Sequence, residues 1–221
     1  MKQLIAILSS IMLLSNAGAQ TLPDSTAYDK GLSMIAAATT VQDYENAGNY
    51  FDGLSTSKPK EWLAPLYAGL CYVLASFHAT DSKLKDQWCD KAQTYLDSAD
   101  VRNADESETA SVQAFLYQAR IDVSPMERGL EYSRKADAEI KKAEADNSSD
   151  PRPYFLYAMN VYYTPKIFGG GAEKALPLFE EAADKFKAFK PAMPFMPHWG
   201  EQQNLEMIEK CKSITGTSEN K

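Results

Sequence analysis

Apolar side chains recur every three or four positions over almost the whole chain, which is the pattern of amphipathic α-helices. No stretch alternates apolar and polar residues for long enough to indicate a half-buried β-strand. The pattern is interrupted by turn-forming clusters of Pro, Gly, Asn, Asp and Ser at residues 57–59, 80–82, 99–106, 124–125, 147–153, 164–171 and 191–200. These breaks predict an all-α protein with about eight helices in residues 25–188.

The predicted helices pair into four hairpins, and the second helix of each hairpin carries the same kind of triad. A small residue comes first, an apolar residue follows four positions later, and another small or apolar residue follows three positions after that. This spacing places all three residues on one face of the helix, where the small residue lets a partner helix approach closely. The triads are Ala47-Phe51-Leu54, Ala92-Leu96-Ala99, Ala136-Ile140-Ala143 and Ala175-Phe179-Ala182.

These triads resemble the second helix of the tetratricopeptide repeat, which carries an Ala, a Phe and an Ala at the same spacing. The first hairpin is the most similar, because Pro59 follows its triad as in that family. Gly69 and Tyr72, with Trp62 near the start of the same helix, resemble the first-helix part of the repeat. The resemblance covers residues 25–188 and implies a right-handed solenoid of about four TPR-like antiparallel helical hairpins. A generic helical bundle is the alternative.

A second resemblance lies in the fourth hairpin. Residues 162–175, with a Pro and three consecutive glycines, are similar to a hairpin turn of uncharacterised exported proteins of the Bacteroidetes type, and the Pro-rich residues 189–199 add to the likeness. This resemblance implies an exported location and a fold, but no activity. We expect a last helix over about 201–211 to cap the open end of a repeat domain that spans 20–212, and residues 213–221 to form a flexible tail.

The chain begins with the features of a secretory signal peptide. Lys2 precedes an apolar run over residues 4–14, and Ala17, Gly18 and Ala19 supply the small residues of a cleavage site. An uncleaved membrane anchor is the alternative, but the run is only about half of the roughly 20 residues that a membrane-spanning helix needs. No cysteine follows the cleavage site for acylation. We therefore expect a periplasmic or otherwise exported protein whose mature chain has no transmembrane helix.

The composition and net charge of the chain argue against one class of partner, nucleic acid. The chain has 221 residues, of which 44% are hydrophobic and 24% charged, as in an ordinary single globular domain. Its net charge is −7. Nucleic acid is excluded as a partner, because affinity for a phosphate backbone requires clustered Lys and Arg. The expected partner is an unknown protein or peptide of the cell envelope.

Two of the three cysteines fall at the same height of one predicted hairpin. With the turn near Thr80, Cys71 and Cys89 lie level on facing helices, within reach of a disulfide if their side chains point inward. An exported protein permits such a bond. The alternative is two buried thiols that pack as small apolar side chains, and Cys211 is unpaired in either case.

The sequence contains no motif for catalysis, cofactor binding or metal binding. His78 and His198 stand alone, without the spacing of a zinc site, and there is no nucleophile elbow. The glycines at 169–171 lack the Gly-Lys-Ser/Thr ending of a phosphate loop, so their predicted role is to accept positive φ. We therefore predict no cofactor and no catalytic or metal-binding residue.

Aromatic side chains are concentrated in the fourth hairpin. Phe155, Met159 and Tyr162 form a stripe at helical spacing, with Arg152 and Tyr163 beside it. If this helix faces the concave side of a solenoid, these residues line a groove for a partner, and core packing is the alternative. The main hypothesis is a non-catalytic interaction or scaffold module of the cell envelope that binds a protein or peptide. The second is a small-molecule or glycan-binding accessory protein in nutrient capture, and the third is a hydrolytic enzyme.

Overall fold

A computed structural model describes residues 25–193 and 195–218, so the predicted signal peptide lies outside the described residues. The described residues form nine α-helices and no β-strand, which confirms the all-α prediction. A short 3₁₀ helix, η1 (Lys166–Phe168), lies between α7 and α8. In chain order the helices are α1 (Ser25–Ala37), α2 (Val41–Ser57), α3 (Leu63–His78), α4 (Ser82–Asp100), α5 (Glu106–Val123), α6 (Pro125–Asp146), α7 (Arg152–Tyr163), α8 (Ala172–Ala188) and α9 (Glu201–Ser218).

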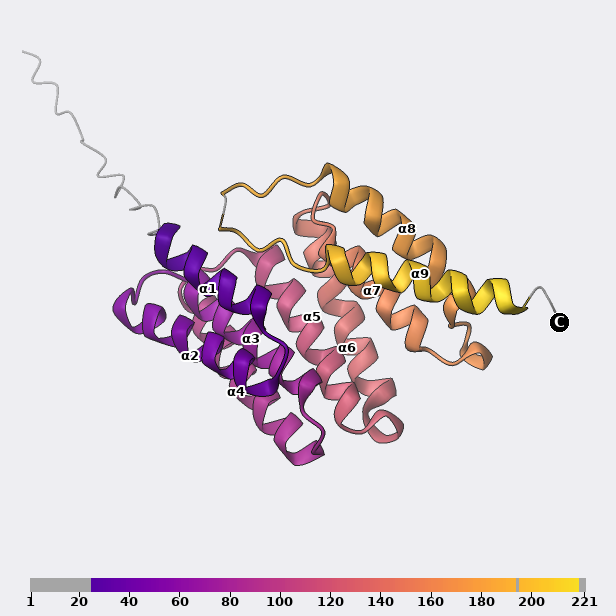
Figure 1. Cartoon of the computed structure of the whole chain (residues 1–221), viewed down its shortest axis with the longest axis horizontal. Coiled ribbons are helices and arrows are strands. Elements are labelled where there is room, and N and C mark those ends of the chain that lie inside the picture. The colour runs from indigo at the N-terminus through magenta and orange to yellow at the C-terminus, as the bar shows by residue number, and fades with distance from the viewer. Residues whose placement is uncertain (1–24, 194, 219–221) are drawn as a thin grey trace, which may run out of the picture.

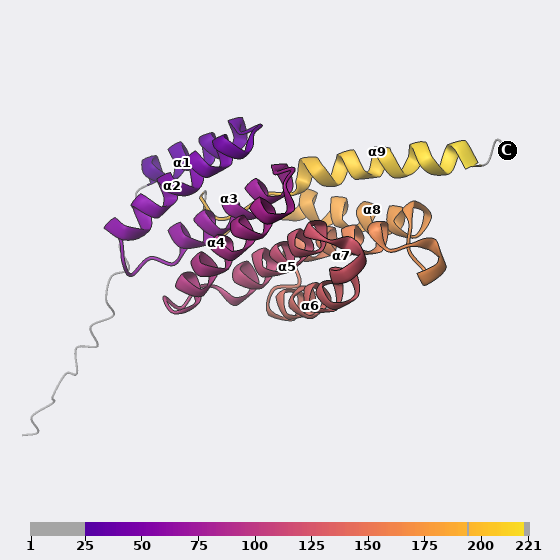
Figure 2. The ribbon, with the colours of Figure 1, turned by 90° about the horizontal axis from the view of Figure 1, so that it is seen from below.

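The helices are stacked in the order in which they occur in the chain. Each packs against the next, and α5 also contacts α3 and α7. Figure 1 shows this row of hairpins from α1 to α9. The view from below shows that the row bends, so that α1 and α9 lie on the same side of it (Figure 2). The first helices α3, α5 and α7 of successive hairpins are neighbours. The handedness of the solenoid and its membership of the tetratricopeptide family stay predictions.

Side-chain caps explain where several helices begin. Thr40 and Asp43 form a capping box at the start of α2: the Asp43 amide donates to Thr40 Oγ1 (3.2 Å) and the Thr40 amide donates to Asp43 Oδ2 (2.9 Å). Asp81 and Asp105 cap α4 and α5 through their carboxylate oxygens. The turn between α1 and α2 was not among the breaks predicted from Gly, Pro and Asn clusters. Its signal is the Thr and Asp three residues apart.

The core is built from the repeated triads. Every triad residue except the partly buried Leu54 is at most 2% exposed. Small residues set how closely helices approach: a Cβ at Gly31 of α1 would lie only 2.3 Å from Phe51 Cζ of α2. The spacing seen in the sequence thus correctly identified which face of each second helix is buried.

The segment between α8 and α9, described over residues 189–193 and 195–200, runs back across the stacked helices and is called the strap below (Figure 1). Tyr67 Oη of α3 donates to the Phe195 carbonyl oxygen (2.7 Å), and the Phe195 ring stacks on Tyr28 of α1 at 5.5 Å between centroids. After the strap, Asn204 Nδ2 of α9 donates to the Phe179 carbonyl oxygen of α8 (2.9 Å). Helix α9 continues past the predicted end at residue 211 to Ser218, so the described part of the predicted tail is helical.

The disulfide considered between Cys71 and Cys89 is not formed: both residues are buried free thiols, as is Cys211. Ser76, rather than Cys71, faces Cys89, with 3.2 Å between Ser76 Oγ and Cys89 Sγ. Cys71 is more than one helical turn further from the hairpin loop. The expectation that Cys71 and Cys89 lie level, which assumed a turn centred at Thr80, was therefore wrong by more than one helical turn. The alternative of two packed thiols describes the structure.

Candidate functional site

Two of the five residues predicted to line a groove are in the interior. Arg152 is 1% exposed and Phe155 is 3% exposed, so neither can meet a partner, and their assignment to a groove was wrong. Phe155 packs against Phe179, with 6.2 Å between ring centroids. The helical spacing was read correctly, but it marks the side of α7 that faces the core.

Arg152 is held by two carboxylates. Its guanidinium donates to both oxygens of Glu108 on α5 (2.5 and 2.7 Å) and, through Nε and Nη2, to both oxygens of Asp150 (2.8 Å each). The hydroxyls of Ser107 and Ser111 donate to Asp150 Oδ2 (3.4 Å each). This buried ion triad joins α5 to the start of α7.

Burial and charge act in opposite directions within the triad. Burial raises the pKa of Glu108, and the positive charge of Arg152 opposes that rise. Burial by itself would lower the pKa of Arg152, but the negative charges of Glu108 and Asp150 outweigh it and raise this pKa. Four of the five guanidinium N–H groups are thus paired within the triad, which is buried and does not face a partner.

The other three predicted groove residues lie progressively nearer the surface. Met159 and Tyr162 are partly buried and pack against the core cluster around α7 and α8. Tyr163 is 66% exposed, with its ring edge-on to Tyr162 at 5.0 Å between centroids. The stripe therefore runs from the core to the surface along α7 and does not form one exposed face.

Sequence reasoning missed a stack of three aromatic side chains from different elements, which we call the aromatic row. Phe77 lies in the last turn of α3, Phe115 lies in the middle of α5, and Trp199 lies in the strap. The ring centroids of Phe77 and Phe115 are 5.0 Å apart with 29° between planes, and those of Phe115 and Trp199 are 5.3 Å apart with 16° between planes. These are offset-stacking distances. All three side chains are partly exposed.

The aromatic row occupies the junction between the two halves of the core. Phe115 and Trp199 pack against both buried clusters, the one around α3 and the one around α8. Leu74, one turn before Phe77, and Met193 in the strap are also apolar and partly buried. Trp199 Nε1 is buried and finds no hydrogen-bond acceptor within residues 25–193 and 195–218. The indole is thus held by stacking, including over the Arg152 guanidinium at 5.8 Å.

Both histidines adjoin the aromatic row in sequence and are exposed. The His78 ring lies 4.8 Å from the ring of Tyr44 on α2. His198 Nδ1 is 3.0 Å from the Met196 carbonyl oxygen, so its Nε2 is the ring nitrogen left to point elsewhere. No group of three or more His, Cys, Asp or Glu in the described part of the chain is arranged to hold a metal ion.

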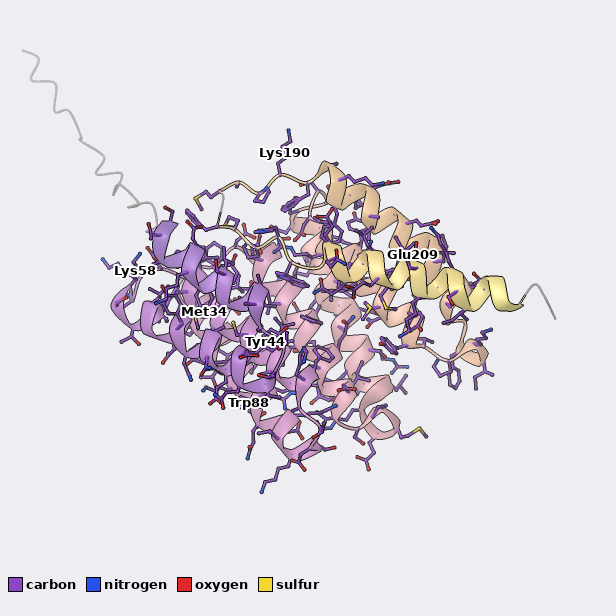
Figure 3. All side chains as sticks on the ribbon, in the orientation of Figure 1. Met34, Tyr44, Lys58, Trp88, Lys190 and Glu209 are labelled. Atoms are coloured by element: carbon purple, nitrogen blue, oxygen red, sulfur yellow. The ribbon has the colours of Figure 1, made fainter. Side chains whose placement is uncertain are left out.

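A second aromatic stack lies on a different side of the molecule. Tyr72 and Trp88 are nearly parallel, with 5.6 Å between centroids, and Lys91 Nζ lies 4.2 Å from the centre of the Tyr72 ring. Figure 3 shows Trp88 at the edge of the molecule opposite the strap, from which Lys190 points outward. Since Tyr72 is fully buried, this stack is a packing feature of α3 and α4.

Comparison with known proteins finds similarity among solved structures. No protein-family model and no curated protein matches the chain. Among solved structures, the chain is similar to the HusA haemophore from Porphyromonas gingivalis, with 29% sequence identity and a TM-score of 0.76. The similarity covers 90% of this chain and 96% of that one, so the two share the fold over nearly their full lengths. None of the described helices is long and apolar enough to cross a membrane.

Proposed function

We propose that this protein is an exported binding protein that captures a flat, largely apolar small molecule of the tetrapyrrole class, with haem as the first candidate. The observation that carries the proposal is the similarity to a haemophore at 29% identity over 90% of the chain. It favours the nutrient-capture hypothesis over the protein or peptide scaffold. It also supports a binding role over catalysis, and export through the predicted signal peptide.

The aromatic row is the surface that suits such a ligand. A planar conjugated ring gains from offset-stacked or edge-to-face contact with another aromatic ring, at about 4.5–7 Å between ring centres. Phe77, Phe115 and Trp199 already stack on one another at such distances, with Phe115 in the middle, and all three stay partly exposed, so a ligand would contact their exposed edges and outer faces. Because the row draws on α3, α5 and the strap, the fold itself fixes the spacing of the rings.

The iron of haem would need an axial ligand, and the chain carries an imidazole next in sequence to two members of the row. His78 follows Phe77 directly and His198 precedes Trp199 directly, and both are exposed. Imidazole is a common protein ligand of haem iron. We propose these two residues as the candidates for iron coordination.

The peptide-groove hypothesis is weakened by the position of its own residues. Arg152, which would have paired with an acidic group of a partner, is saturated by Glu108 and Asp150. Phe155, which would have been an anchor for a peptide, is in the core. What remains exposed of the stripe is Tyr163, and one exposed ring is too little for a groove.

Haem titration followed by the Soret absorbance tests the proposal. We expect saturable binding by residues 20–221, and about fivefold to a hundredfold weaker binding by Phe77→Leu/Phe115→Leu, because two aromatic stacking partners are each worth about 0.5–1.5 kcal/mol. Leucine preserves apolar contact, so the loss reports on the π faces. The matched control is Tyr117→Leu/Tyr132→Leu, a pair at 5.9 Å on α5 and α6, which should bind as the wild type does.

Iron-free protoporphyrin separates stacking from coordination. If the histidines bind iron, His78→Ala/His198→Ala reduces affinity for haem and leaves affinity for protoporphyrin unchanged. Absence of a saturable Soret change in the wild type, or equal losses in the row and control variants, would refute capture on the aromatic row.

A further inference from the structure

Among the described residues, the turn between α7 and α8 carries a group of strongly exposed apolar side chains close together in the chain. Ile167 is 85% exposed, Phe168 is 75% exposed and Tyr163 is 66% exposed. These three residues and Lys166 are called the tip below. The turn projects from the end of the molecule opposite α1, beyond the start of α8 (Figures 1 and 2). Large apolar side chains are normally buried. A group of them on the surface indicates a site where the protein contacts another apolar surface.

Main-chain bonds hold the tip in this shape. The amide of Phe168 donates to the Pro165 carbonyl oxygen (2.8 Å), and the amide of Gly171 donates to the Val161 carbonyl oxygen (2.9 Å). Gly169 and Gly171 have φ of 87° and 101°, which favours glycine. At Gly170, any Cβ would lie 2.1 Å from the Thr164 carbonyl oxygen. The glycines thus close a tight turn that keeps Ile167 and Phe168 pointing away from the core.

The charge around the tip differs from that of the whole protein. The chain has a net charge of −7, but no acidic residue occurs between Asp150 and Glu173. Lys166 belongs to the tip itself and is exposed. Lys210 of α9 adds a second cation nearby, with its Nζ 5.2 Å from the centre of the Tyr162 ring. Glu173 and Lys174, both exposed at the start of α8, offset each other in charge, so the turn itself carries one positive charge, at Lys166. An apolar tip with a cation on an acidic protein is complementary to a surface that is both apolar and anionic.

We propose that the tip docks the protein on an anionic phospholipid bilayer. Ile167 and Phe168 enter the boundary between headgroups and acyl chains, while Tyr163 and Lys166 lie at the level of the headgroups, where tyrosine and lysine are favoured. The geometry favours a bilayer over a protein partner. A stable protein interface buries about 1,200–2,000 Å² over matched surfaces, whereas a bilayer accepts a small convex projection. This docking is independent of the ligand bound at the aromatic row.

Flotation with lipid vesicles tests the docking. Residues 20–221, which keep every described residue and omit the apolar signal peptide, are mixed with vesicles of phosphatidylcholine containing phosphatidylglycerol at low salt. We expect the wild type to float, and Ile167→Asp/Phe168→Asp to show a partition coefficient at least about tenfold lower, because two apolar side chains lose their burial. Lys166→Glu should weaken binding to anionic vesicles more than to pure phosphatidylcholine.

The matched control substitutes two other exposed apolar residues. Met126 and Leu130 of α6 are 97% and 69% exposed, and Met126→Asp/Leu130→Asp should float as the wild type does. All substituted positions are on the surface, so unchanged thermal unfolding verifies that each variant is folded. A wild type that stays with the vesicle-free fraction, or a tip variant that floats equally well, overturns the proposal. So does a dimer in light scattering that Ile167→Asp/Phe168→Asp dissociates, since the tip would then pair with a second copy.

Discussion

Replacement of Arg152 by methionine tests the buried ion triad. Methionine keeps much of the length and apolar character of the side chain but leaves the carboxylates of Glu108 (6% exposed) and Asp150 (0% exposed) without their partner. Removing one partner of a buried pair costs about 3–5 kcal/mol, because an uncompensated charge stays in the interior. For a chain of this size, that corresponds to a decrease of roughly 6–20 °C in melting temperature.

Thermal and urea unfolding at neutral pH measure the loss, and a surface ion pair supplies the control. Lys142 Nζ lies 3.0 Å from Glu106 Oε1 with both side chains about half exposed. Lys142→Met should therefore change the free energy of unfolding by about 0–1 kcal/mol. If Arg152→Met melts within the range of the Lys142→Met control, the triad is not the desolvated network described above.

The pH dependence gives a second test of the same triad. Burial already raises the pKa of Glu108 against the opposing charge of Arg152, so removing Arg152 raises it further. A group whose pKa is higher in the folded than in the unfolded state stabilises the fold at low pH and loses that contribution as pH rises through the folded pKa. The stability difference between wild type and Arg152→Met should therefore shrink as pH is lowered from neutral toward 5. A difference that grows over this interval would contradict the reasoning.

Two further predictions concern packing and thiol chemistry. Ala175 is fully buried where α8 meets α7, so Ala175→Leu should overpack that contact and lower the free energy of unfolding by roughly 1–3 kcal/mol; an unchanged urea midpoint would show that the contact is not close. Cys71 and Cys89 are buried free thiols whose pKa values are raised by burial. Both should resist alkylation in the native protein, and mass spectrometry after denaturation without reductant should find all three cysteines alkylated.

The parts of the fold that depend on local spacing could be predicted from the sequence. Ala92, Leu96 and Ala99 are buried together because a helix fixes which residues share a face, whatever it packs against. The same spacing could not distinguish a buried stripe from an exposed one, so Phe155 was assigned to a groove. Arg152 was misassigned for a related reason. Asp150 precedes it by two residues, but its other partner, Glu108, is on another hairpin, and the sequence gives no sign of that distant carboxylate.

The aromatic row could not be predicted because its members come from three separate elements. Phe77, Phe115 and Trp199 meet through the packing of α3 on α5 and through the return of the strap. Each is an ordinary apolar residue in its own segment. The sequence shows only that His78 follows Phe77 and that His198 precedes Trp199. These adjacencies point to a site only after the structure has shown that the rings stack.

The strap also changes how the whole chain should unfold. In a stack of repeats, each unit normally contacts its neighbours alone, so the ends can unravel while the middle stays intact. Here the hydrogen bond between Tyr67 and Phe195 joins residues 128 positions apart, and Phe195 reaches Tyr28 of the first helix. The segment before the last helix therefore contacts the first hairpins directly. Loss of either end must release the other, so we expect the helices to melt together in one cooperative transition.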